Sequence, residues 1–260
     1  MGDYHMRFLR GFAALAAIGA MFALQPAQAD PIPVDLELQL LVDDSGSVSA
    51  SEFALQRDGY VAAFRDSGII DAIENGDIGA IAVQLIYWAS SGQQQIAVDW
   101  FLITDSVSAN AFADLVAATT EPYSGSTAPG SAINFGVSQF NNDYDGTRQV
   151  IDVSGDGAQN NGADTATARD AALAAGIDSI NGLPILTDDA NLDDWYLANI
   201  VGGANGFLVV AENFDDFAQA VITKIGYEIS GEIPLPGAIP LMVTGLALLW
   251  GRTRRRKQQA

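Results

Sequence analysis

The side chains that could carry chemistry in this chain are almost all oxygen donors. Its 260 residues include no cysteine and a single histidine, His5, near the N-terminus. Without His or Cys, residues 30–260 cannot form a Ser-His-Asp triad, a cysteine nucleophile, a Cys/His zinc site or a histidine-ligated haem. Any metal must therefore be bound by oxygen, and acid–base chemistry is left to carboxylates, tyrosines or Lys224.

Three separated loops collect such oxygen donors. The first follows an apolar strand, the second is rich in Ser and Gly and precedes a helix, and the third follows a later strand. Their candidate ligands are Asp43, Ser45, Ser47, Thr127 and Asp156. Ligands of open α/β sheets bind outside the carboxyl ends of the strands, so these loops can meet there. Two carboxylates and three hydroxyls suit Mg²⁺, with Mn²⁺ or Ca²⁺ as alternatives.

The elements that would position these loops alternate between strands and helices. We predict strands at 35–42, 80–88, 94–101, 149–153, Ile185 and 207–210, and helices at 49–66, 108–118, 131–140, 165–175 and 214–229. The strands at 80–88 and 94–101 should form an antiparallel hairpin. This alternation predicts an α/β fold, a doubly wound and mostly parallel central sheet with an antiparallel edge strand and helices on both faces. With no repeat or linker, residues 30–232 should be one domain.

The order of the candidate ligands resembles the von Willebrand factor type A domain and its metal-ion-dependent adhesion site. Asp43, Ser45 and Ser47 match the Asp-x-Ser-x-Ser signature of that family, Thr127 matches its Thr, and Asp156 matches its late Asp. Other stretches, including Val-Ile-Asp-Val-Ser-Gly-Asp-Gly, resemble an uncharacterised secreted bacterial branch known only as a domain of unknown function. The resemblance implies a bound divalent metal and a partner protein whose Asp or Glu side chain completes the metal coordination.

Both ends of the chain have the pattern of targeting segments. Residues 1–29 read as a signal peptide with an Ala-x-Ala cleavage site, so the mature chain should begin at Asp30. At the other end, the apolar segment 237–250 precedes a basic cluster, which is typical of a membrane stop. Residues 233–260 resemble a Val-Pro-Leu-Pro-Ala sorting signal, which implies an exosortase-type processing enzyme. We therefore expect an exported protein in the periplasm or on the cell surface, anchored transiently or permanently in the inner membrane by the C-terminal helix.

The charge pattern narrows the function classes. Between the two predicted targeting segments stand five cations and 31 acids, a net charge of −26, which argues against nucleic-acid binding. We interpret the chain as a metal-dependent protein-binding or adhesion module and not as an enzyme. Two alternatives stay open. One is a metal-assisted hydrolase, in which only Asp44 or Asp152 could supply a general acid or base; the other is a purely structural metal site.

Overall fold

The protein is described from a computed structural model that covers residue 2 and residues 30–231. The predicted signal peptide and the predicted sorting segment at 233–260 lie outside the described residues, residue 2 excepted.

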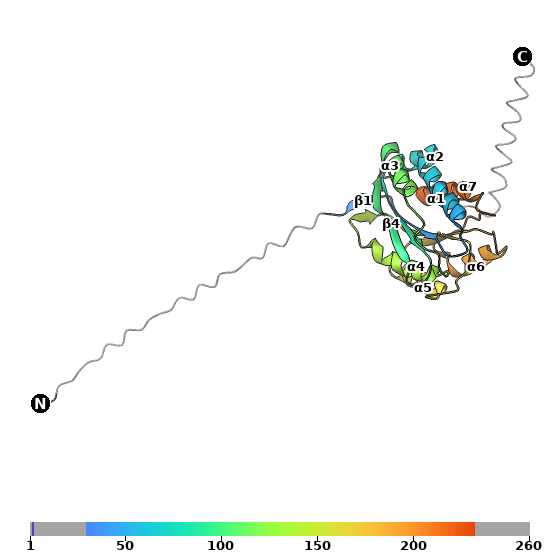
Figure 1. Cartoon of the computed structure of the whole chain (residues 1–260). Helices are drawn as coiled ribbons and strands as arrows, with labels where there is room; N and C mark the ends of the chain where they lie inside the picture. Colours follow the sequence, from blue (N-terminus) through green and yellow to red (C-terminus); the bar gives the residue numbers. More distant parts are fainter. Residues whose placement is uncertain (1, 3–29, 232–260) are drawn as a thin grey trace, which may run out of the picture. The chain divides into compact units, whose positions relative to one another are not determined.

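A six-stranded sheet forms the centre of the part of the chain that the structure describes (Figure 1). Its strand order is β4-β3-β2-β6-β7-β8. The bounds of these strands are β2 (Leu36–Asp43), β3 (Ile81–Trp88), β4 (Gln94–Ile103), β6 (Gln149–Gly155), β7 (Ser179–Pro184) and β8 (Gly202–Gly203). The four inner strands are parallel, and β4 and β8 pair antiparallel at the two edges. The predicted doubly wound sheet with an antiparallel edge strand is therefore confirmed.

Helices cover both faces of this sheet, so its inner strands are buried along almost their whole length. The face covered by α1, α2, α3 and α7 contributes one core cluster, and the face covered by α4, α5 and α6 contributes another. The bounds are α1 (Ala50–Arg65), α2 (Ser67–Glu74), α3 (Ser106–Ala117), α4 (Pro129–Val137), α5 (Thr165–Ala174), α6 (Leu192–Asn199) and α7 (Phe217–Ser230). Leu40 and Leu41 of β2 are both buried but belong to opposite clusters, as the alternation of a strand requires.

Smaller elements complete the described chain. A parallel pair of short strands joins β1 (Ile32–Val34) to β5 (Tyr144–Gly146), and a short 3-10 helix spans Ser138–Phe140. A capping box begins α1: the Glu52 amide donates to Ser49 Oγ and the Ser49 amide donates to Glu52 Oε2.

Several element predictions were wrong or incomplete. The helices α2 and α6 were not predicted, and α2 starts because the Asp66 carboxylate caps the amides of Gly68 and Ile69. A strand was predicted at Ile185, but the structure places β7 just before that residue. The sequence shows only a short apolar cue there, because β7 contains buried Asn181 and Gly182. The segment 207–210 makes only isolated bridges, including Gly182 with Leu208.

The expected localisation is corrected by the structure. Among residues 2 and 30–231, no helix has both the length and the apolar character needed to cross a membrane. The predicted anchor through a membrane helix is therefore not supported by the described residues. The segment predicted to form that helix, 237–250, lies outside it.

Candidate metal centre

The first two predicted loops are joined to each other at the carboxyl end of the sheet. Gly46, in the loop after β2, donates its amide to the carbonyl of Gly125 at 2.7 Å, and Ser45 forms a parallel bridge with Gly125. A side chain at Gly46 would place a Cβ 3.3 Å from the Gly125 carbonyl oxygen. The close contact between the two loops therefore favours glycine at position 46.

The predicted hydroxyls and Asp156 form a continuous chain of oxygens. Thr127 Oγ1 lies 3.4 Å from Ser45 Oγ, which lies 3.2 Å from Ser47 Oγ, and Ser47 Oγ donates to Asp156 Oδ1 at 2.7 Å. Adjacent ligands of an octahedral ion with metal–oxygen bonds of about 2.1 Å lie about 3.0 Å apart. These hydrogen-bonded separations are also compatible with oxygen ligands that share one small cation.

Asp43 supplies the second carboxylate of the centre. Each of the two carboxylates has one oxygen without a hydrogen-bond partner in the described chain. Asp43 Oδ1 accepts the Ser45 amide at 2.8 Å. Asp43 Oδ2 and Asp156 Oδ2 are buried and have no hydrogen-bond partner among the residues that the structure describes. Buried polar oxygens are costly to leave unpaired. The two orphaned oxygens together with the hydroxyl chain fit an oxygen-bound divalent cation.

The electrostatics of the centre point the same way. Burial raises the pKa of Asp43 well above its ordinary value, and the nearby negative charge of Asp156 raises it further. Burial also raises the pKa of Asp156, against the lowering effect of its hydrogen bond from Ser47. No described group of three or more His, Cys, Asp or Glu side chains could hold a metal. A cation here would depend on the hydroxyls as well as on the two carboxylates.

Two neighbours of the centre were not found by sequence reasoning. Asn160 accepts the Thr127 amide at 2.9 Å through Oδ1, and its Nδ2 donates to Thr127 Oγ1 at 3.4 Å, so it positions the predicted Thr. Tyr196 of α6 is fully buried, and its hydroxyl has no hydrogen-bond partner in the described chain. A Cβ at Gly155 would lie 2.6 Å from Asp43 Oδ2 and 2.9 Å from the Tyr196 hydroxyl, which places that hydroxyl behind the centre.

The two carboxylates considered as a general acid or base lie in different surroundings. Asp44 is buried, and its Oδ2 accepts the Tyr123 amide at 2.7 Å. Burial is the main cause that raises the pKa of Asp44 to about 7, and the charge of Glu121 adds to it. Asp152 lies inside the sheet layer and forms an ion pair with Lys224, so the structure does not bring it into the oxygen chain.

The doubly wound sheet, with oxygen donors at the carboxyl ends of its strands, defines a von Willebrand factor type A-like fold. More specifically, the chain belongs to the family described as "Protein of unknown function (DUF1194)", which matches residues 33–233. No curated protein matches the chain. This match confirms the predicted membership of a family known only as a domain of unknown function.

Solved structures support the same fold. Proximal thread matrix protein 1 from the mussel byssus superimposes with a TM-score of 0.59 at 15% identity, over 78% of this chain and 50% of that one. A form of that protein is described with a zinc-occupied MIDAS motif (TM-score 0.53, 12% identity, 78% and 50% coverage).

Two bacterial structures are also similar to this chain. The pilus adhesin SpaC from Lactobacillus rhamnosus GG superimposes with a TM-score of 0.54 at 16% identity, over 78% of this chain and 31% of SpaC. The von Willebrand factor type A protein from Catenulispora acidiphila superimposes with a TM-score of 0.53 at 14% identity, over 75% of this chain and 43% of that one. The chain thus spans half or less of the length of these proteins.

Proposed function

We propose that this chain is a divalent-metal-dependent binding module in which a carboxylate of a partner protein completes the coordination of the metal. The metal would be held by the predicted set Asp43, Ser45, Ser47, Thr127 and Asp156. The observation that carries the proposal is the pair of buried, unpartnered oxygens, Asp43 Oδ2 and Asp156 Oδ2, beside the chain of hydroxyls.

The residues around the centre hold its ligands in place before any partner arrives. The Ser45 amide fixes Asp43, Asn160 fixes Thr127, and Ser47 fixes Asp156. A bound divalent cation supplies a Lewis-acidic position for an anionic ligand. Because two carboxylates carry no more charge than the cation and the hydroxyls are neutral, the occupied centre would have no net negative charge of its own to repel a further carboxylate.

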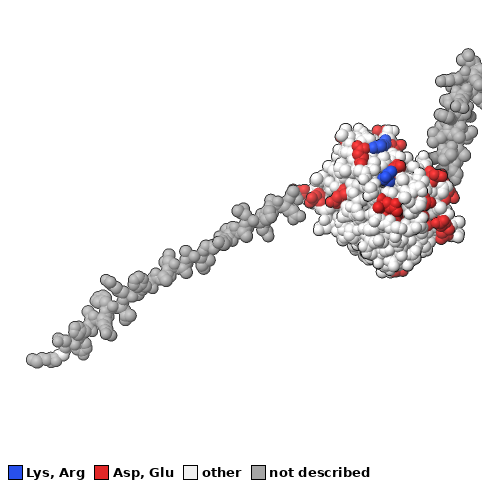
Figure 2. Space-filling model, viewed as in Figure 1, with Lys and Arg blue, Asp and Glu red and all other residues white. Residues whose placement is uncertain are grey.

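The similar proteins support this proposal by analogy. A metal-occupied MIDAS motif is described for the mussel protein, and SpaC is described as a pilus adhesin. The donors in this chain are all oxygen atoms, which favours Mg²⁺ or Mn²⁺ over Zn²⁺. Figure 2 shows acidic side chains across the visible face and few basic ones, so an acidic partner must overcome a repulsive field.

A binding role accounts for the surroundings better than hydrolysis does. A metal-assisted hydrolase needs a free acid or base beside the metal. The carboxylate of Asp152 is engaged by Lys224, and that of Asp44 is buried and accepts the Tyr123 amide. These contacts support a role for Asp152 in the core and for Asp44 in holding the neighbouring loop.

Thermal unfolding with and without metal tests the metal site. Mg²⁺ or Mn²⁺ should raise the melting temperature and EDTA should reverse the gain, since a ligand at a hundredfold excess over Kd stabilises the folded state by about 2.7 kcal/mol. Asp43→Asn should abolish the gain because it removes a charged ligand. The matched control is Asp44→Asn, which keeps an oxygen to accept the Tyr123 amide and should keep the gain. A metal response in Asp43→Asn equal to that of the wild type would refute the assignment.

A binding experiment tests the partner separately. Immobilised wild-type protein should retain a protein from a cell extract in Mg²⁺ and release it in EDTA, whereas immobilised Asp43→Asn should retain none. If partner capture is insensitive to EDTA while the thermal response to metal is intact, the metal site is structural and the adhesion proposal fails.

A further inference from the structure

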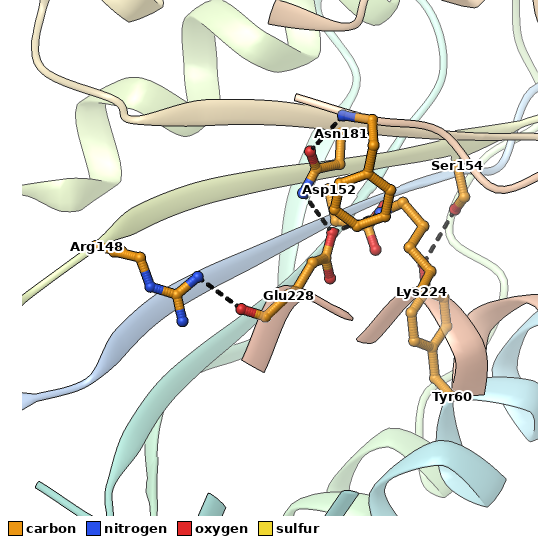
Figure 3. Close-up of polar contacts among 8 residues, drawn as sticks. Tyr60, Arg148, Asp152, Ser154, Asn181, Lys224 and Glu228 are labelled. Atoms are coloured by element: carbon orange, nitrogen blue, oxygen red, sulfur yellow. Dashed lines mark hydrogen bonds and ion pairs between the residues drawn. The ribbon is translucent and has the colours of Figure 1, made fainter. Parts of the chain in front are cut away.

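A second group of buried charges lies between the sheet and α7 (Figure 3). Lys224 and Asp152 are fully buried and Glu228 is 2% exposed. Lys224 Nζ lies 2.5 Å from Asp152 Oδ1 and donates to Glu228 Oε1 at 2.7 Å. An amine and two carboxyl groups are thus held in direct contact, out of reach of bulk water.

The surroundings of this group weaken its charged form. Apart from Lys224 Nζ, no hydrogen-bond donor within the described residues reaches Asp152, so its ion pair with Lys224 is what stabilises the anion there. Burial raises the pKa of Asp152, and it raises that of Glu228 to about 7. A proton transferred from the amine to Asp152 would replace a buried ion pair by two neutral groups.

We propose that Lys224 and Asp152 form an intramolecular amide bond, with Glu228 as the proton carrier. Such a bond would be a covalent modification that ties α7 to the central strand β6. The proposal rests on this cluster alone and is independent of the metal centre.

The reaction balances with the groups present. A proton passes from Lys224 Nζ to the Asp152 carboxylate, which leaves a neutral amine beside a neutral carboxylic acid. The amine nitrogen attacks Asp152 Cγ, Glu228 accepts a proton from that nitrogen, and Glu228 returns it to the departing hydroxyl. One C–N bond forms, one C–O bond breaks, one water is released, and no oxidant or co-reactant is needed.

Neighbouring residues hold the proton carrier, which also lines a pocket. Asn181 Nδ2 donates to Glu228 Oε1 at 2.9 Å, and Arg148 donates to the backbone carbonyl of Glu228 at 2.7 Å (Figure 3). A pocket of about 200 Å³ is lined by Glu228, Asn181, Phe207 and Arg148 among others. Held contacts of this kind favour an intramolecular reaction because the reacting groups need no diffusional encounter.

Peptide mass spectrometry of the full-length wild-type protein tests the proposal. Trypsin should fail to cleave after Lys224 and should release the peptide 149–169, which contains Asp152, joined to the segment around Lys224. The joined mass should be lower than the sum of its parts by one water, about 18 Da. Cleavage after Lys224 with both peptides at their sequence masses would overturn the proposal. If peptide 149–169 is released unmodified and the uncleaved peptide that begins at Asp170 is lighter by one ammonia, about 17 Da, the proposal is overturned as well and the bond is assigned to Asn181.

Two variants separate chemistry from folding. Glu228→Gln keeps the size of the side chain but removes the proton carrier, so it should yield the two unmodified peptides from a folded protein. Asp152→Ala should also yield an unmodified Lys224 peptide. If the joined peptide persists in Glu228→Gln, the role of Glu228 is refuted, and if it persists in Asp152→Ala, the assigned bond is refuted. Because the wild-type masses decide first, a variant that does not fold leaves the test intact.

Discussion

Two aspartates of one strand and its following turn, Asp152 and Asp156, are both buried, yet their charges are balanced in different ways. Asp152 lies within β6 and faces α7, where Lys224 contacts it directly. Asp156 lies just past the end of β6, where Ser47 donates to one oxygen and no described cation pairs with it or with Asp43. The core therefore supplies its own counter-charge, whereas the edge of the sheet leaves that role to a ligand.

The contrast would be contradicted most directly if Lys224 could be replaced without a loss in the free energy of unfolding. Lys224→Met should lower the free energy of unfolding by about 3–5 kcal/mol, because Asp152 then has neither its ion pair nor the proposed amide bond and, like Glu228, is left buried without a cation. Urea unfolding measures the loss. The control is Arg57→Met, since Arg57 pairs with Asp58 at the surface and exposed pairs contribute about 0–1 kcal/mol. Equal losses in the two variants would contradict the distinction.

The pH dependence of stability without metal sharpens the contrast at the edge of the sheet. The pKa of Asp44 is raised from 3.8 to about 7, so its stabilising contribution is complete below about pH 4 and is lost as pH rises to 7. Asp43 and Asp156 shift in the same direction. In EDTA, the free energy of unfolding should therefore fall over this range.

The variant Asp44→Asn isolates this contribution. Chemical unfolding at a series of pH values should give a shallower fall for Asp44→Asn than for the wild type. A wild-type stability that is constant or rises between pH 4 and 7 in EDTA would show that these carboxylates are compensated within the chain.

Removing one of the two uncompensated charges should have a smaller effect of opposite sign. In EDTA at neutral pH, Asp43→Asn should raise the free energy of unfolding by about 1 kcal/mol. It relieves repulsion with Asp156 and keeps an oxygen to accept the Ser45 amide. Asp215→Asn, at an exposed position, serves as the control and should change little. A clear loss of stability in Asp43→Asn would mean that the carboxylate charge is needed without metal.

The smallest effect should come from the unpartnered hydroxyl behind the metal centre. Tyr196→Phe should change the stability in EDTA by less than about 1 kcal/mol, because no hydrogen bond within the described residues is lost. Isothermal titration with Mn²⁺ then shows whether the hydroxyl contributes to the occupied centre. A large loss of stability in EDTA would reveal a hydrogen bond in the metal-free protein.

The candidate ligands were predictable because they stand in fixed relation to strands with a strong apolar signal. β2 and β6 read clearly from their buried residues, so the loops that follow them could be placed at one edge. Tyr196 could not be predicted, since α6 has only a weak apolar pattern and its acidic first turn reads as a solvated surface. Asn160 lies in an irregular loop whose approach to Thr127 has no sequence signature.

The sequence by itself determined the class of fold, the order of the five candidate ligands and the exclusion of His and Cys chemistry, because these follow from residue types and local periodicity. Only the tertiary structure decided which charges are balanced. Asp152, Asn181 and Glu228 are far apart along the chain, and the packing of α7 against the sheet brings them together around Lys224. That packing depends on the shapes of both layers, which no local pattern encodes.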